Sequence, residues 1–341
     1  MTMKAILFAS AAALTAANGA FAADAIVAAE PEPMEYVRVC DAFGTGYFYI
    51  PGTETCLKIG GYIRFQTDFG PNKSGTSDWN TFTRAQLEFE AKNDTEFGTL
   101  SSLVALRTNA RDSSGSVDNK TFLDQGYIEI AGLRVGMQYS WWDDDLSGET
   151  DVIASNETRH NAIRYQYETD AFKAGIAVEE LEDAYNTKPG EGPNNVGITG
   201  QVSGTVGIVT AYLLGGYDTD TEEGAVRAII YADLGPGQLG IYGAYASGAN
   251  YYYEESEWTV GAQYELKIND KFSITPGAQY FSKIDLSSTG NGFTGGDAWI
   301  GGVTVDYKIT DGLKTKVSVQ YQDEEGSDDE VFGFVRLQRD F

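Results

Sequence analysis

The residues that could carry catalytic or metal chemistry are few in this sequence. His160 is the only histidine, and Cys40 and Cys56 are the only cysteines among 341 residues. A structural zinc site takes four ligands, mostly Cys and His, and a nucleophilic triad needs a base beside its Ser or Cys. His160 follows Arg159 with no recognisable Ser or Cys motif around it. We therefore expect no catalytic site, no metal site and no cofactor, and a protein that is not an enzyme.

Charged side chains, most of them acidic, are abundant in this sequence. Fifty Asp and Glu residues against 24 Lys and Arg give a formal net charge of −26. This balance excludes nucleic acid as a partner, because phosphate binding needs a basic face. One acidic run lies in segment 141–160 and consists of Asp143, Asp144, Asp145, Glu149, Asp151 and Glu157. Four arginines occupy alternating positions of segments that read as extended: Arg64, Arg84, Arg107 and Arg134.

The elements that must position these charges are β-strands. Apolar or small residues recur at every second position in 57–69, 81–92 and 313–322, and charged or amide residues fill the positions between them. A strand with one apolar face buries that face against another sheet or against lipid. Forty Gly, 21 Tyr and 17 Phe also favour strands and tight turns. No run of eighteen apolar residues follows the N-terminal segment, so no helical membrane span is expected.

The connections between strands distinguish a membrane barrel from a soluble sandwich. The sequence divides into sixteen segments, beginning near 57, 80, 98, 121, 132, 161, 172, 195, 207, 225, 238, 257, 271, 298, 313 and 331. Short and long connections alternate between them, as in an outer-membrane barrel with short periplasmic turns and long outer loops. We therefore predict an all-β protein, a 16-stranded antiparallel transmembrane β-barrel. In a closed barrel the last strand is paired on both sides, with Phe341 on its outward face.

The N-terminus predicts export. Residues 1–22 combine one Lys, an Ala-rich apolar run and the sequence Ala20-Phe21-Ala22, which is typical of a cleaved signal peptide. The run is too short for a transmembrane anchor. In an exported protein a disulfide between Cys40 and Cys56 can persist, and free thiols or metal ligands are the alternatives. We expect 1–22 to be a signal peptide, 23–56 an N-terminal periplasmic segment with a disulfide hairpin, and 57–341 the barrel.

One stretch resembles a known family. The sequence "CDAFGTGYFYIPGTETCLKIGGYIRF" (40–65) is similar to the opening of alphaproteobacterial porins, with two cysteines bracketing a Tyr/Phe-rich hairpin. "YIEIAGLRVGMQYSWWD" (127–143) also resembles that family's strand pair before the third loop. The resemblance implies a trimeric, water-filled channel in the bacterial outer membrane whose third loop folds inward.

An infolded third loop would give the charged residues a role. The carboxylates of 141–160 would then face lumenal Arg64, Arg84, Arg107 and Arg134 across the narrowest point and create a transverse field. Such a field favours polar solutes over apolar ones. The alternative is that these residues are ordinary solvated loop carboxylates and arginines paired with their neighbours.

Three functional classes are considered. The least expected is a barrel enzyme such as an outer-membrane phospholipase or protease, because it needs a Ser-His or Asp-His constellation and the sequence has a single His. Of the other two, the first is an outer-membrane porin for passive diffusion of small hydrophilic solutes and ions, with a preference for cations. The alternative is a substrate-selective channel, for example for sugars, which would need a ladder of aromatic side chains along the lumen. Partners are expected to be outer-membrane lipid and lipopolysaccharide. A homotrimer is also expected, because the outward faces of the early strands are aliphatic: Ile59, Ile63, Leu87, Leu106, Ile128 and Ile130.

Overall fold

The computed structural model describes residues 38–113, 116–118, 120–155, 158–181, 196–288 and 291–341. The expected signal peptide and residues 23–37 of the N-terminal segment lie outside this part of the chain, as does Glu157. The division into signal peptide, periplasmic segment and barrel therefore stays a prediction.

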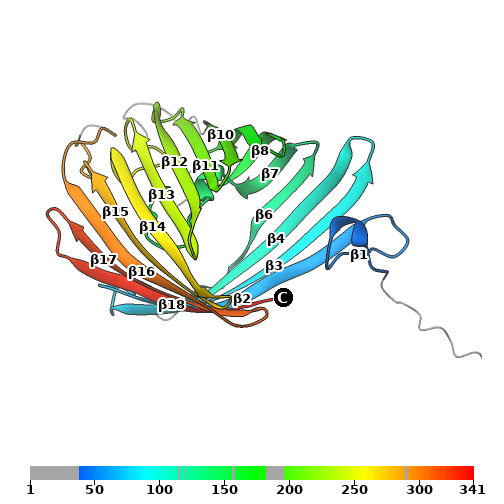
Figure 1. Cartoon of the computed structure of the whole chain (residues 1–341), viewed down its shortest axis with the longest axis horizontal. Helices are drawn as coiled ribbons and strands as arrows, with labels where there is room; N and C mark the ends of the chain where they lie inside the picture. The colour runs from blue at the N-terminus through cyan, green and yellow to red at the C-terminus, as the bar shows by residue number, and fades with distance from the viewer. Residues whose placement is uncertain (1–37, 114–115, 119, 156–157, 182–195, 289–290) are drawn as a thin grey trace, which may run out of the picture. The chain divides into compact units, whose positions relative to one another are not determined.

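Sixteen antiparallel strands form a closed barrel, as predicted (Figure 1). Each strand pairs with the next along the chain, and β18 pairs with β2 to close the cylinder. The barrel strands are β2 (Cys56–Phe69), β3 (Trp79–Thr95), β4 (Gly98–Ser113), β6 (Thr121–Ile130), β7 (Leu133–Tyr139), β8 (Arg159–Glu168), β9 (Phe172–Glu180), β10 (Val196–Val206), β11 (Val209–Asp218), β12 (Glu223–Leu234), β13 (Gly237–Ala246), β14 (Trp258–Asn269), β15 (Phe272–Ser282), β16 (Asp297–Thr310), β17 (Leu313–Glu324) and β18 (Glu330–Asp340). Two short strands, β1 (Phe48–Tyr49) and β5 (Ser116–Asp118), are additional.

Alternating side chains give the barrel an apolar outside and a polar inside. In β17, Val319 and Tyr321 are exposed on the outer face, whereas Ser318 and Gln320 are buried inside. Buried glutamines recur on the other strands, among them Gln66, Gln86, Gln201, Gln263, Gln279 and Gln338. Because successive side chains of a strand point to opposite faces, the period of two sorts the residues into a lipid-facing and a lumen-facing set.

Phe341 is held in place by the strand that closes the barrel. Its backbone N–H donates to Gly61 O at 3.0 Å, and the N–H of Gly61 donates to Phe341 O at 3.1 Å. The phenyl ring lies on the outer face with Val331, Val335 and Leu337, all of them exposed. The chain therefore ends in paired sheet, because a closed barrel leaves no free edge.

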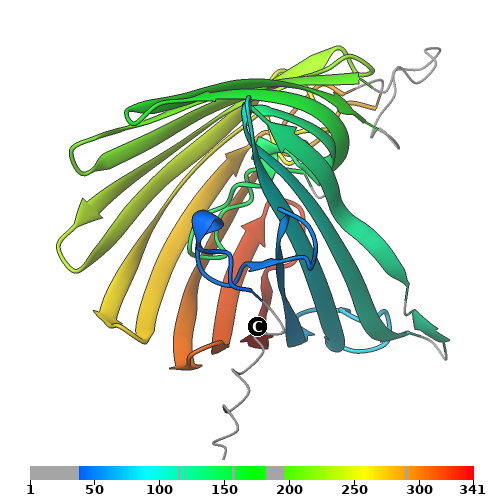
Figure 2. The ribbon, with the colours of Figure 1, turned by 90° about the vertical axis from the view of Figure 1, so that its right-hand side faces the viewer.

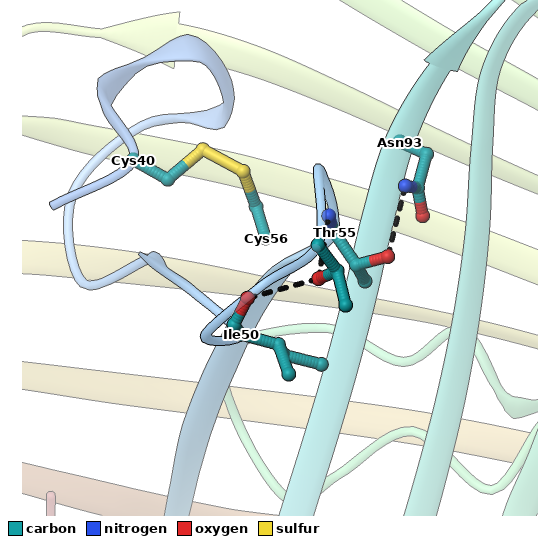
Figure 3. Close-up of a disulfide and its surroundings, with 6 residues drawn as sticks. Cys40, Ile50, Thr55, Cys56 and Asn93 are labelled. Carbon is teal, nitrogen blue, oxygen red and sulfur yellow. Dashed lines mark hydrogen bonds between the residues drawn. A yellow bond between two sulfur atoms is a disulfide. The ribbon is translucent and has the colours of Figure 1, made fainter. Parts of the chain in front are cut away.

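The N-terminal hairpin is crosslinked as expected (Figure 3). Cys40 and Cys56 form a disulfide with their Cα atoms 6.0 Å apart. Strand β1 pairs with the start of β2, and Asn93 Nδ2 donates to Thr55 Oγ1 at 2.9 Å. Tyr47 also bonds to Glu90 of β3. These contacts hold the hairpin against one end of β2 and β3 (Figure 2).

Helical structure is minor in the described residues. Two 3-10 helices are present there, η1 (Asp41–Phe43) and η2 (Trp141–Asp143). No helix in this part of the chain is long and apolar enough to cross a membrane.

Candidate functional site

Loop 3, residues 140–158 between β7 and β8, crosses the inside of the barrel over its described part, residues 140–155. Five barrel strands separate β7 and β8 from the group β14–β17 in either direction around the sheet, yet loop 3 hydrogen bonds to all four strands of that group. The bonds are Gly148 N to Gln263 Oε1 (3.1 Å), Val152 N to Gln279 Oε1 (2.9 Å), Glu149 N to Thr304 Oγ1 (3.2 Å) and Thr150 Oγ1 to Gln320 Oε1 (2.8 Å). Loop 3 therefore spans the lumen from one wall to the opposite one.

Arg227 of β12 binds loop 3 on both sides of the segment that crosses the lumen. Its guanidinium donates to the carbonyls of Trp141 (2.6 Å), Trp142 (2.8 Å) and Ile153 (3.4 Å). The side chain is 2% exposed. A buried charge needs hydrogen-bond partners, and here the loop backbone supplies them. The alternation in β12 places Arg227 inside, but the sequence gives no signal for the carbonyls that it binds.

A second loop, residues 247–257 between β13 and β14, packs against loop 3. The rings of Trp142 and Tyr252 stack at 5.6 Å, and Ser155 N donates to Tyr252 O at 3.0 Å. Tyr252 Oη donates to buried Glu179 of β9 at 3.0 Å. Gly216 makes room for this stack, since a Cβ there would lie 2.7 Å from Tyr252 Cδ2. The packing fixes the base of loop 3.

The acidic residues of loop 3 surround an open space. Asp143, Asp144 and Asp145 line a cavity of about 390 Å³ together with side chains of β11 and β12. Asp143 accepts a hydrogen bond from Thr158 Oγ1 (2.6 Å), and Asp144 accepts one from Gln201 Nε2 (3.2 Å). Among the described residues, no ion pair involves these three carboxylates.

Burial shifts the titration of these carboxyl groups. Loss of water raises the pKa of Asp145 to about 6, with repulsion from Asp143 and Glu149 adding to the rise. Burial likewise raises the pKa of Asp151 to about 7, although this carboxylate accepts the N–H of Leu146 at 2.6 Å. The pKa of Asp143 is also raised by burial. Desolvation disfavours the charged form of an acid, so loop 3 changes its charge near neutral pH.

If ions pass through the lumen beside loop 3, we expect this shift to make their selection depend on pH. Carboxyls with a pKa of about 6 to 7 are ionised at pH 8 and take up protons as the pH falls to 5. Cation preference, measured as a reversal potential under a salt gradient, should therefore be larger at pH 8 than at pH 5. Ordinary carboxyls stay charged in this window, so the double variant D145N/D151N should lose most of the dependence. If the cation preference of D145N/D151N fell as steeply between pH 8 and pH 5 as that of the unmodified protein, the role assigned to Asp145 and Asp151 would be contradicted.

The four predicted arginines have different partners. Arg64 Nε donates to Gln338 Oε1 and Arg84 Nε to Asn109 Oδ1, both at 2.7 Å, so neutral amides hold these two charges. They lie directly opposite each other in β2 and β3. Arg107 pairs with fully buried Asp124 at 2.8 Å, and Arg134 pairs with Glu129 at 2.6 Å. Among the described residues, no carboxylate forms an ion pair with Arg64 or Arg84, so both keep their positive charge on the lumenal wall.

Two basic residues that the sequence did not single out complete the wall. Arg336 Nε donates to Gln66 Oε1 at 2.6 Å, another neutral acceptor. Lys316 forms an ion pair with Glu149 at 2.9 Å, which joins loop 3 to the basic wall. Arg64, Lys316 and Arg336 line a common cavity of about 260 Å³. Lys316 and Arg336 could have been identified from the sequence, because they occupy the polar face of the alternating segments 313–322 and 330–341.

Taken together, the closed sixteen-stranded barrel and the loop that crosses its polar interior define a porin-type channel of the bacterial outer membrane. The chain belongs to the porin subfamily, whose profile matches residues 24–334. It is similar to outer membrane protein IIIA of Rhizobium leguminosarum bv. viciae, with 48% identity over 98% of this chain and 93% of that protein. It is also similar to porin Omp2b of Brucella suis, with 37% identity over 80% of this chain and 72% of that porin.

A solved structure agrees with the fold. The trimer form of OmpT from Vibrio cholerae superimposes with a TM-score of 0.62 at 15% identity, covering 85% of this chain and all of OmpT. The predictions of family, fold class and outer-membrane location are thus confirmed.

Proposed function

We propose that the protein is a general diffusion channel that passes small hydrophilic solutes and ions and prefers cations. The observation that carries this proposal is the charge arrangement inside the barrel. Asp143, Asp144 and Asp145 line one cavity without ion pairs among the described residues. Arg64, Arg84 and Arg336 are bonded to neutral amides on the wall. Neither set neutralises the other, so a transverse field should exist between them.

The field suggests how solutes are selected. A polar solute aligns its dipole with the field, whereas an apolar solute must displace ordered water without replacing its interactions. The overall acidity, with a formal charge of −26, adds a preference for cations. Asp151 extends the acidic side along loop 3. Glu149, Arg107 and Arg134 are each paired with an opposite charge and contribute less to the field.

The arrangement of lumenal aromatic rings favours this function over a sugar-selective channel. Arg64 lies over Tyr62 at 5.0 Å from the ring centroid, Arg84 over Phe82 at 5.5 Å and Arg336 over Phe334 at 4.3 Å. Cations over these faces occupy the surfaces on which a sugar ring would stack. These three rings therefore support the arginines and do not offer free stacking faces.

The outer surface supports a homotrimer in contact with lipid. The outward faces of β2–β7 carry aliphatic side chains such as Ile63, Leu87 and Ile128, all of them exposed. The strands β2–β7 expose the aromatic residues Phe65 and Trp79. Exposed aromatic residues suited to the membrane interface are more numerous on the outer faces of β8–β17: Tyr165, Tyr167, Phe172, Tyr217, Tyr245, Trp258, Trp299, Tyr307 and Tyr321. We propose that β2–β7 pack around a three-fold axis and that the aromatic face contacts outer-membrane lipid and lipopolysaccharide. The similar OmpT has been solved in a trimer form.

One planar-bilayer experiment tests both proposals. Purified protein should insert as ohmic channels with a reversal potential that indicates cation preference in a KCl gradient at pH 8. Each insertion should close at high voltage in three equal steps, one for each protomer. A reversal potential at the chloride equilibrium value would contradict the selectivity, and single-step closure of every insertion would contradict the trimer. Saturation of the current by one sugar at low concentration would favour the substrate-selective alternative.

A further inference from the structure

An apolar patch on the inner wall stands out against the polar lumen. Phe281 of β15 and Ala298 and Ile300 of β16 are buried, and they pack together with Val152 of loop 3 and Ile284. The patch lies at the end of the wall where the long loops are. It belongs to the face that carries buried Gln279 and Thr275 further along β15. Val152 and Ile284 cover most of this apolar surface.

These residues form one side of a cavity whose other side is acidic. The cavity measures about 310 Å³ and is also lined by Phe332 and by three carboxylates, Glu254, Glu255 and Glu324. Val152 is shared between the cavity and loop 3, so the cavity lies directly beside the crossing of the lumen. An organic molecule of roughly ten non-hydrogen atoms fits a space of this size.

The three carboxylates lack cationic partners in the described part of the chain. No ion pair found there includes Glu254, Glu255 or Glu324. Within the described residues, the carboxylate of Glu324 accepts hydrogen bonds from the neutral donors Gln322 Nε2 and Ser327 Oγ, at 3.0 and 3.3 Å. The pKa of Glu255 is raised by burial and by repulsion from Glu254 and Glu324. The negative charges therefore crowd one another beside an apolar surface.

The segment that carries two of these carboxylates is well fixed. Glu254 and Glu255 stand between Tyr253 and Ser256, which are both buried and whose hydroxyls lie 3.0 Å apart. The burial of Tyr253 and Ser256 therefore fixes the segment that holds Glu254 and Glu255 at the rim of the cavity.

We infer that this cavity is a binding site for amphipathic organic cations. The ammonium group would lie among Glu254, Glu255 and Glu324, and the apolar part would lie against the side of the cavity that Phe281, Ala298 and Ile300 line. An inorganic divalent cation fits less well, because no group of His, Cys, Asp and Glu side chains in the described residues has metal-binding geometry. A bound cation would narrow the path beside loop 3 and reduce the current, an effect that rests on the proposed channel function.

Block of single-channel current by quaternary ammonium ions tests the inference. Hexyltrimethylammonium and tetramethylammonium carry the same charge, but the first adds five methylenes, each worth up to about fourfold in affinity when buried. At pH 8 in KCl, hexyltrimethylammonium added on the side of the long loops should halve the current at a concentration at least about tenfold lower than tetramethylammonium.

Two triple variants locate the site. E254Q/E255Q/E324Q removes the acidic rim, and the half-blocking concentration of hexyltrimethylammonium should rise by about tenfold or more. D323N/E325Q/D328N removes three exposed carboxylates outside the cavity, and block should stay within about twofold of the unmodified protein. Equal block in the unmodified protein and the first variant would overturn the inference, as would block that does not depend on the alkyl chain.

A second measurement separates this inference from the channel proposal. Calorimetric titration of the detergent-solubilised protein with hexyltrimethylammonium reports binding whether or not current flows. Binding that is lost in E254Q/E255Q/E324Q but kept in the control variant supports the site even if no channel were recorded. A normal cation-selective channel without chain-dependent binding would overturn the site and leave the channel function intact.

Discussion

Replacing Arg227 by leucine is expected to release loop 3 from the wall of the barrel and to raise both the conductance of the channel and its open-state noise. The guanidinium binds the carbonyls of Trp141, Trp142 and Ile153. Hydrogen bonds from a charged donor contribute about 1.5–3 kcal/mol each, so losing even two weakens the attachment by about 3–6 kcal/mol. The detached loop should become more populated by a factor of about one hundred or more.

The measurement is single-channel recording of the R227L variant beside a surface control. The control variant K173M removes a charge from an exposed ion pair between Lys173 and Glu168 at the end of a strand. The conductance of K173M should equal that of the unmodified protein. Retention of the folded barrel is checked by resistance to unfolding in dodecyl sulfate without heating. A folded R227L channel with unchanged conductance and noise would show that Arg227 does not hold loop 3.

The regular part of the barrel could be predicted from the sequence because local rules govern it. A period of two separates the two faces of each strand, and the alternation of short and long connections gives the number of strands. The sixteen predicted starting points fall at or within a few residues of the observed strands, as for Val209 of β11 and Trp258 of β14. Inward positions such as Arg64 and Arg84 follow from the same alternation.

The interior contacts could not be predicted, because they join residues far apart in the chain. Arg227 and Trp142 are 85 residues apart, and Thr150 and Gln320 are 170 apart. No local pattern selects one buried glutamine among several as the partner of a particular loop atom. The packing of the 247–257 loop against Trp142 depends in the same way on the closure of the barrel.

Glu324 shows that the residues of one acidic stretch need not all be exposed to solvent. Glu324 stands in the acidic stretch 323–330 of the sequence, but β17 continues to Glu324. The alternation of β17 points this side chain toward the lumen, where it lines the cavity beside the apolar patch. Its neighbours Asp323 and Glu325 are exposed. This is why they, with Asp328, serve as the outer-loop control below and Glu324 does not.

Neutralising the acidic face of loop 3 is expected to have the largest effect on selectivity. The variant D143N/D144N/D145N keeps the size of the three side chains and does not alter the pairing of any barrel strand. These charges line a cavity between loop 3 and the wall, where low-dielectric surroundings strengthen their effect on passing ions. Because focused fields change local ion concentrations by about tenfold or more, the cation-to-anion permeability ratio should fall by a factor of about three or more.

The most direct test of loop 3 as the selective constriction is the reversal potential of this variant beside D323N/E325Q/D328N, measured in one KCl gradient at pH 8. Both variants lose three negative charges, but the control loses them from exposed positions, where salt screens charges over about 10 Å. We predict a large shift toward the chloride equilibrium value for D143N/D144N/D145N and a small one for the control. Equal shifts would mean that selectivity arises from the acidity of the outer mouth and would contradict the role assigned to loop 3.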